Sequence, residues 1–201
     1  MDFDLPNPRV STLRVDYGTG IRQAVHHLAT IGHSQISFIS GPPQLHSAKA
    51  RIETFRIAAK DAHFSARDIR IVEGDHTLEG GMRAFEHMQA RNELPAAIMC
   101  SNDMTAIGVM RSAYAAGLDV PRDLSIVGFD DIRFAQFTTP ALTTIQMSRT
   151  DLARSAFNAL RDHGQHPLSS TAREYPIPTR LIVRQSTAAP PRQSSRRSGK
   201  N

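Results

Sequence analysis

Two hydrophobic periods alternate along the chain between residues 16 and 187. In some stretches apolar residues recur every three or four positions, as on one face of a helix. In short runs between them nearly every residue is apolar, as in a buried strand. Helices are expected over residues 17–31, 47–62, 78–90, 103–117 and 150–162, and strands over 11–15, 36–39, 69–72, 96–100, 124–129, 143–145 and 175–183. This alternation predicts an α/β fold with an open, mainly parallel sheet and helices on both of its faces.

Composition narrows the class of protein. A single cysteine, Cys100, excludes a fold built on disulfides. The longest nearly apolar stretch, residues 94–100, is too short to cross a bilayer, and the acidic N-terminus is not followed by the apolar run of a signal peptide. We therefore expect a soluble, cytoplasmic protein with no membrane partner.

The net charge of +5 comes mostly from the C-terminal end. Residues 188–201 carry four basic side chains and no acidic one, which leaves +1 on the rest of the chain. Because this segment is rich in Ser, Pro and Arg and poor in large apolar residues, we expect a disordered, solubilising tail. The charge is therefore no argument for a nucleic-acid interface.

Polar residues follow the predicted strands, where the carboxyl ends of parallel strands meet loops and ligands bind. They are Ser47 and Arg51, Glu73 and His76, Asn102 and Asp103, and Asp130 and Asp131. Carboxylate, amide and guanidinium groups around one crevice suit a polyhydroxylated or other polar small molecule. The same residues also have ordinary structural interpretations: Asn102 or Asp103 can cap the helix that follows, Asp130 can close a turn, and Arg51 can be a surface charge.

Nothing in the sequence indicates an enzyme. Asp130 and Asp131 are neighbours and face opposite ways in extended chain, so they make a poor acid–base pair. Gly41-Pro42-Pro43 lacks the Lys-Ser/Thr of a phosphate loop, there is no Gly-x-Ser-x-Gly elbow, and one cysteine with scattered histidines makes no zinc cluster. We expect no catalytic residue, no cofactor and no metal.

Six motifs occur in order along the chain. They are residues 27–33 (HLATIGH), 39–42 (ISGP), 100–108 (CSNDMTAIG), 120–131 (VPRDLSIVGFDD), 140–145 (PALTTI) and 181–187 (LIVRQST). Together they resemble the effector-binding core of the LacI/GalR family of bacterial transcription regulators, over about residues 2–187. The resemblance implies a periplasmic-binding-protein-like fold of type I, in which two α/β lobes close on a sugar or similar effector.

The resemblance also implies roles for single residues. Arg51 matches the arginine that grips the effector, and Asn102 and Asp130 match polar strand-end contacts. The remaining implied effector-binding residues are Ser47, His76, Arg149 and Asp2. His76 stands where the family often has a stacking aromatic residue, Arg149 where some members have an aromatic wall, and Asp2 aligns with a carboxylate of the other lobe only through a one-residue gap.

A homodimer is implied through the second lobe. Ile107 and Arg111, on the helix after Asn102, and Phe134 and Phe137, in the following loop, fall where family members pair; the alternative is that the two aromatic rings only cover the edge of the sheet. Operator DNA would be bound only through an N-terminal helix-turn-helix that this chain lacks.

The resemblance implies that the two lobes are not equally represented in the chain. Residues 1–15 would be a remnant of the first lobe, 16–145 the second lobe, 146–165 a crossover helix of the first lobe, 166–187 the return strand and end of the core, and 188–201 the tail. With one lobe essentially complete and the other largely missing, we expect the crossover helix to dock poorly and effector affinity to be weak or lost.

The sequence also leaves two other functions open. A periplasmic sugar-binding protein of a transporter would share the fold and the pocket chemistry. A small α/β enzyme using Asp130 is the more remote alternative.

Overall fold

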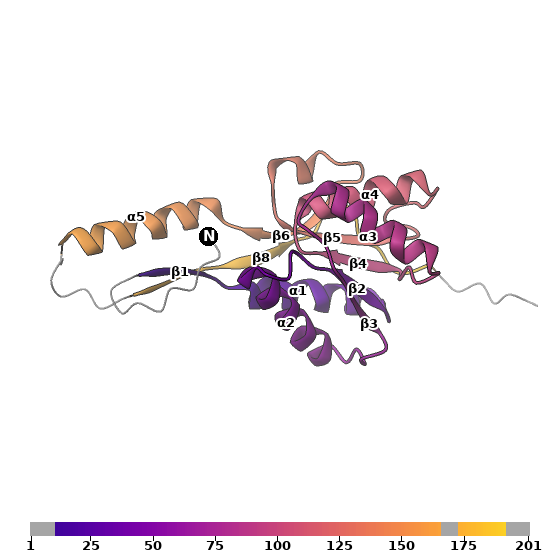
Figure 1. Ribbon diagram of the computed structural model, residues 1–201, viewed down its shortest axis with the longest axis horizontal. Coiled ribbons are helices and arrows are strands. Elements are labelled where there is room, and N and C mark those ends of the chain that lie inside the picture. Colours follow the sequence, from indigo (N-terminus) through magenta and orange to yellow (C-terminus); the bar gives the residue numbers. More distant parts are fainter. Residues whose placement is uncertain (1–10, 166–172, 192–201) are drawn as a thin grey trace, which may run out of the picture.

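The computed structural model describes residues 11–165 and 173–191, and a six-stranded sheet lies at the centre of that part of the chain (Figure 1). The strand order is β3–β2–β4–β5–β6–β8. The strands are β2 (Ile36–Ile39), β3 (Ile69–Val72), β4 (Ala97–Cys100), β5 (Ser125–Asp130), β6 (Thr143–Met147) and β8 (Thr179–Ile182). All neighbours run parallel except β8, which is antiparallel to β6. The predicted α/β class with a mainly parallel sheet is confirmed.

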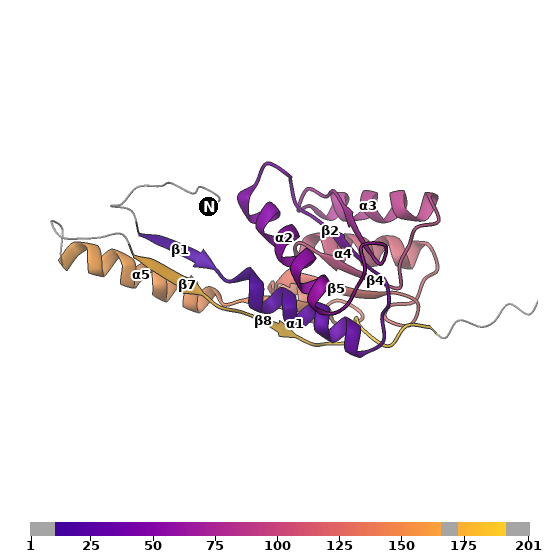
Figure 2. The ribbon, with the colours of Figure 1, turned by 90° about the horizontal axis from the view of Figure 1, so that it is seen from below.

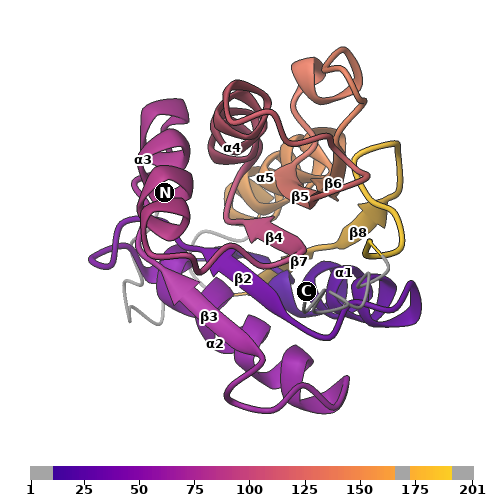
Figure 3. The same cartoon turned by 90° about the vertical axis from the view of Figure 1, so that its right-hand side faces the viewer.

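Helices cover both faces of this sheet (Figure 3). On one side lie α1 (Tyr17–Thr30) and α2 (His46–Asp61), and on the other α3 (Leu78–Ala90) and α4 (Asp103–Ala115). Each layer has its own core of buried apolar side chains, one around the stacked rings of Phe38 and Phe55 and the other around Phe85 and Met88. Strands β2 and β4 are buried along their whole length because both of their faces are covered.

The first helix begins as its sequence predicts. The side chain of Asp16 accepts hydrogen bonds from the backbone N–H of Thr19, at 3.1 Å, and from its hydroxyl group, at 2.6 Å. This cap satisfies a free N–H of the first turn and lowers the pKa of Asp16, chiefly through the hydroxyl of Thr19.

Away from the central sheet, β1 (Thr12–Val15) pairs in parallel with β7 (Glu174–Ile177) (Figures 1 and 2). The single strand predicted over residues 175–183 is wrong, because the chain forms β7 and β8 in two different sheets. The break falls at Pro178, which has no N–H to contribute to a ladder.

Helix α5 (Arg149–Gln165) lies beside the β1–β7 pair, away from the central sheet (Figure 1). The carboxylate of Asp162 accepts a hydrogen bond from the hydroxyl of Tyr175 at 2.9 Å and pairs with Arg173 at 3.2 Å. On this side the two strands give α5 a surface to contact. Its other side is uncovered, with Phe157 65% and Leu160 74% exposed.

The core extends into the segment that was predicted to be a tail from residue 188 onward. The backbone N–H of Ala188 donates to the hydroxyl of Ser125, and its carbonyl accepts from that hydroxyl, both at 3.0 Å. The buried ring of His33 also contacts the carbonyl of Ala188 through Nε2 at 3.0 Å. The boundary at 188 was wrong because these backbone groups have polar partners inside the domain. Residues 192–201 lie outside the described residues.

Two further features bear on the function. No helix within residues 11–165 and 173–191 has the length and apolar character needed to span a membrane. The only cysteine of the chain, Cys100, is buried at the end of β4, and burial raises the pKa of its thiol.

Helices α3 and α4 approach each other through glycines, and this contact generates a prediction. A Cβ atom at Gly108 would lie 2.0 Å from the carbonyl oxygen of Leu78, a backbone atom that cannot rotate away. We expect Gly108→Ala to lower the free energy of unfolding by about 1–3 kcal/mol, as overpacking does, measured by urea denaturation. Gly18→Ala is the matched control: its new Cβ would meet mainly the flexible end of Arg22, so we expect a change within about 1 kcal/mol. Equal losses in the two variants would contradict the argument.

Candidate functional site

The carboxyl ends of β2, β3, β4 and β5 lead into the residues that the sequence marked as a site. Arg51 lies on α2 after β2, His76 follows β3, Asn102 follows β4, and Asp130 ends β5. Parallel strands bring these ends to one edge of the sheet. The predicted convergence is therefore present in the structure, and contacts between the side chains bear it out.

Arg51 is the centre of the cluster. It is only 8% exposed, so its interpretation as a surface charge is excluded. Its guanidinium donates from Nη1 to the carbonyl oxygen of Ser101 at 2.7 Å, and its Nη2 lies 3.8 Å from Oδ1 of Asp130. The guanidinium carbon also lies 4.9 Å from the ring centre of Tyr17 and 4.3 Å from that of Phe129. Within the described part of the chain, the buried Nε–H of Arg51 has no hydrogen-bond acceptor.

Asp130 supplies the negative charge of the cluster and remains reachable from solvent, with 29% of its side chain exposed. Burial raises the pKa of its carboxyl, and the positive charges of Arg51 and Arg149 oppose that rise. Arg149, an exposed residue at the start of α5, is therefore close enough to Asp130 to influence its charge. The cluster joins two cations to one partly open carboxylate.

Asn102 has the structural role that its position suggested. Its Oδ1 accepts from the backbone N–H of Thr105 at 2.9 Å and caps α4. Its Nδ2 donates to the carbonyl of His76 at 2.8 Å, which ties the loop after β3 to the loop after β4. One N–H of the amide is left over after these two bonds.

His76 links three of the loops at this edge. Its Nδ1 lies 3.0 Å from the hydroxyl of Ser101, and its backbone has a left-handed φ of 66°. A Cβ atom at Gly41 would lie 2.0 Å from Nε2 of His76, so only glycine leaves room for the ring. The contact between His76 and Gly41 was not predicted from the sequence, in which only the turn at Gly41 after β2 was noted.

The other predicted effector-binding residues are placed less tightly. Ser47 is half-buried on α2, one helical turn before Arg51 and on the same face. Asp2 lies outside the described residues. Tyr17 and Phe129, whose rings flank Arg51, were not among the predicted residues.

A second carboxylate, that of Asp103, is buried at the start of α4, next to Asn102. Asp103 is fully buried, and its oxygens accept from the hydroxyl of Thr144 at 2.5 Å and from the backbone N–H of Ile132 at 2.8 Å. Burial raises the pKa of Asp103 to about 7; the hydrogen bonds from Thr144 and Ile132 oppose this rise, and the charges of Asp130 and Asp131 add to it.

Two of the residues expected at a dimer interface are on α4, on the α3–α4 side of the sheet (Figure 3), and two are in the segment after β5, where Ile132 and Ala135 pack in the same core as α4. Ile107 is half-buried and Arg111 is exposed on α4, while Phe134 and Phe137, in and after the short helix η1 (Arg133–Gln136), are 69% and 66% exposed. Met104 and Tyr114, which were not among the predicted residues, add exposed apolar surface on α4. Both aromatic rings are therefore largely exposed to solvent.

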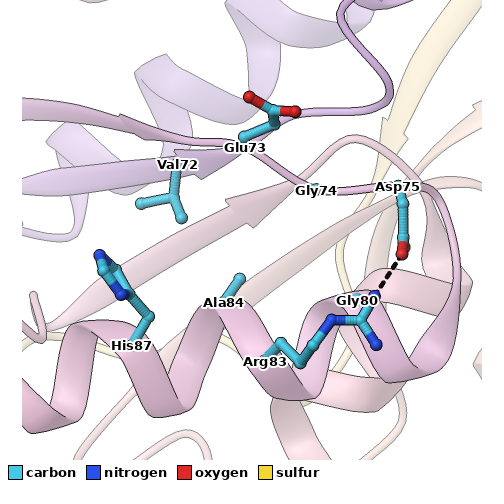
Figure 4. A pocket seen from close by; sticks show the side chains of 8 residues that line it. All are labelled: Val72, Glu73, Gly74, Asp75, Gly80, Arg83, Ala84 and His87. Carbon is cyan, nitrogen blue, oxygen red and sulfur yellow. Dashed lines mark hydrogen bonds and ion pairs between the residues drawn. The ribbon is translucent and has the colours of Figure 1, made fainter.

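A hollow of about 380 Å³ lies elsewhere, between the end of β3 and α3 (Figure 4). Val72, Ala84 and His87 line it, and the ion pair between Asp75 and Arg83 closes one end. None of Arg51, Asn102 and Asp130 borders this hollow. Within the described ranges, no group of histidine, cysteine and acidic side chains is placed to hold a metal ion.

Comparison with known proteins gives one consistent result. The sequence pattern of the periplasmic binding protein-like domain matches residues 25–187. The HTH-type transcriptional repressor PurR of Klebsiella pneumoniae (strain 342) is 35% identical over 170 residues, which is 84% of this chain and 49% of that protein. The chain thus spans about half the length of the curated relatives it matches.

Solved structures agree with this result. A LacI family transcriptional regulator from Enterococcus faecium with bound ribose superposes with a TM-score of 0.84 at 26% identity, over 92% of this chain and 68% of that one. The lac repressor dimer bound to operator and the anti-inducer ONPF superposes with a TM-score of 0.82 at 28% identity, over 90% of this chain and 62% of that one.

The buried Asp103 makes stability depend on pH. Its pKa is about 7 in the folded chain against an ordinary value of 3.8, so the folded state holds this proton more tightly than the unfolded state. Asp103 therefore lowers the free energy of unfolding progressively as pH rises from about 4 to about 7. Urea denaturation across this range should show that decline, and Asp103→Asn, which cannot ionise, should reduce it. A carboxyl ¹³C titration of Asp103 near its ordinary value would contradict the prediction.

Proposed function

Since the chain belongs to the family of periplasmic binding protein-like domains and has the effector-binding core of a LacI/GalR-type regulator, we propose that it binds a polar, sugar-like effector as part of a transcription repressor. One observation carries the proposal. Arg51, Asn102 and Asp130, far apart in the sequence, come together at the carboxyl edge of one parallel sheet. The predicted regulator, rather than a transporter's binding protein, is supported because the relatives and structural neighbours are transcription regulators.

The chemistry of the cluster suits a polyhydroxylated ligand. The Asp130 carboxylate can accept hydrogen bonds from two neighbouring hydroxyl groups, and the guanidinium of Arg51 can donate to an oxygen beside them. The remaining N–H of Asn102 is a further donor, and Ser47, His76 and Arg149 are proposed to line the same site. All of these groups form or break hydrogen bonds without covalent change, so we propose binding and no catalysis.

Effector binding can be tested on the ¹⁵N-labelled chain by NMR titration with ribose and a panel of other mono- and disaccharides. NMR detects millimolar binding, so a weak interaction is still measured. We expect shifts at the side chains of Arg51 and Asn102, and at least about tenfold weaker binding in Arg51→Gln, because a hydrogen bond to a charged group contributes about 1.5–3 kcal/mol.

Arg56→Gln is the matched control, since Arg56 is on the same helix but exposed and contacts only Glu53 among the ion pairs of the described residues. Binding equally weakened in both variants would contradict the assignment of Arg51. An absence of shifts with every sugar would contradict the proposed ligand class.

We also propose that two copies of the chain pair through the surface formed by α4 and η1, with Ile107, Arg111, Phe134 and Phe137 at the contact. Exposed aromatic and apolar side chains on neighbouring elements support it, and a structural neighbour is a dimer. Operator DNA is proposed as a partner of the whole regulator, bound outside this core, which would place the protein in the cytoplasm.

Dimerisation can be measured by sedimentation equilibrium. The double variant Phe134→Ser/Phe137→Ser should raise the dimer dissociation constant at least about tenfold, because each ring would lose an apolar contact worth more than about 1 kcal/mol. Phe157→Ser, which removes an equally exposed ring from α5, should leave the constant unchanged. Dissociation caused by the Phe157 variant alone would place the interface elsewhere.

A further inference from the structure

Two aspartates in succession adopt a backbone conformation that side chains rarely take. The φ angles of Asp130 and Asp131 are 105° and 52°, both in the region that favours glycine. Such a conformation persists only where surrounding contacts hold it. The contacts that hold this turn matter because its first residue, Asp130, pairs with Arg51.

Asp131 points into the protein and is fully engaged there. Its Oδ1 accepts from Nη2 of Arg184 and its Oδ2 accepts from Nε2 of Gln146, both at 2.7 Å. The side chains of Asp131 and Arg184 are only 13% and 19% exposed. With both carboxylate oxygens engaged and little of the side chain exposed, Asp131 is poorly placed to contact a ligand.

Arg184 lies in the segment that follows β8 and is itself fixed by residues at the start of β6. Its Nη1 donates to the carbonyl of Leu142 at 2.8 Å, and its backbone N–H donates to the hydroxyl of Thr143 at 2.9 Å. One residue past Asp131, the backbone N–H of Ile132 donates to the buried Asp103. The turn is thus anchored directly after Asp130, by a planar guanidinium and by a second carboxylate.

The ion pair of Asp130 is longer than that of Asp131. The separation between its Oδ1 and Nη2 of Arg51 is 3.8 Å, so a small rotation of the turn would separate the two groups. Because Asp130 and Asp131 are adjacent in the same turn, a displacement of the backbone at Asp131 also moves the carboxylate of Asp130.

We propose that the Asp131–Arg184 ion pair is a positioning pair, which holds the turn so that the carboxylate of Asp130 stays against Arg51. Its importance for effector recognition rests on the function proposed above. Its geometry does not, because the contacts of Asp131 with Arg184 and of Asp130 with Arg51 involve only residues of this chain.

The test therefore uses the ligand-free chain. The NMR signal of the Arg51 Nε–H group reports the environment of the guanidinium, and Asp130→Asn gives its reference position when the charge of Asp130 is lost. We expect Asp131→Asn to shift this signal toward the Asp130→Asn position, although Asp131 does not contact Arg51. Arg184→Lys keeps a charge but loses the planar two-sided contact, and should shift the signal part of the way.

Arg180→Gln is the matched control. Arg180 belongs to the same network, donating to Oε1 of Gln146 at 2.9 Å, but it is exposed and does not contact Asp131 among the described interactions. The signal should stay unchanged in this variant. Spectra are recorded where circular dichroism shows each variant folded, since a loss of stability alone does not shift the signal of the folded state.

An unmoved Arg51 signal in Arg184→Lys and in folded Asp131→Asn would overturn the proposal, as would an equal shift in Arg180→Gln. If Asp131→Asn does not fold, Arg184→Lys decides alone. Failure of the sugar titration would reject the proposed ligand and leave this outcome unaffected, so the two inferences fail separately.

Discussion

A buried guanidinium needs acceptors and polarisable neighbours, and the Arg51 side chain dictates what gathers around it. The carbonyl of Ser101, the carboxylate of Asp130 and the rings of Tyr17 and Phe129 come from three parts of the fold: the end of β4, the end of β5 and the start of α1. They can meet only if β4 and β5 end at the same level and α1 and α2 cover the same face. The site is thus a consequence of sheet register, and Arg51 is also one of the contacts that holds that register.

The secondary structure could largely be predicted from sequence, because inner strands of a parallel sheet are apolar on both sides and helices on one side only. The run 97–100, buried at every position, is the clearest case. The division of residues 175–183 into two strands could not be predicted in the same way. It depends on β7 pairing with β1, more than a hundred residues earlier, and Pro178 alone does not say which sheet each half joins.

Prediction of the site succeeded where one rule sufficed. Residues after parallel strands meet at one edge, and this rule placed Arg51, Asn102 and Asp130 together. It gave no sign of the left-handed backbone of His76 or of its contact with Gly41, because these depend on how loops from different strands fold over one another. Asn102 shows that a structural role and a binding role need not exclude each other: the amide caps α4 and joins two loops, and still has one donor left.

The buried Cys100 has a consequence for the chemistry of the whole chain. Its thiol is the only one in the sequence, it lies inside the sheet, and its raised pKa keeps it protonated at neutral pH. Since the thiolate is the reactive form, alkylating reagents and mild oxidants have no ready target. A cysteine introduced on the surface would therefore be the single labelled position, which makes the native chain suitable for fluorescence and spin-label measurements without removing its own thiol.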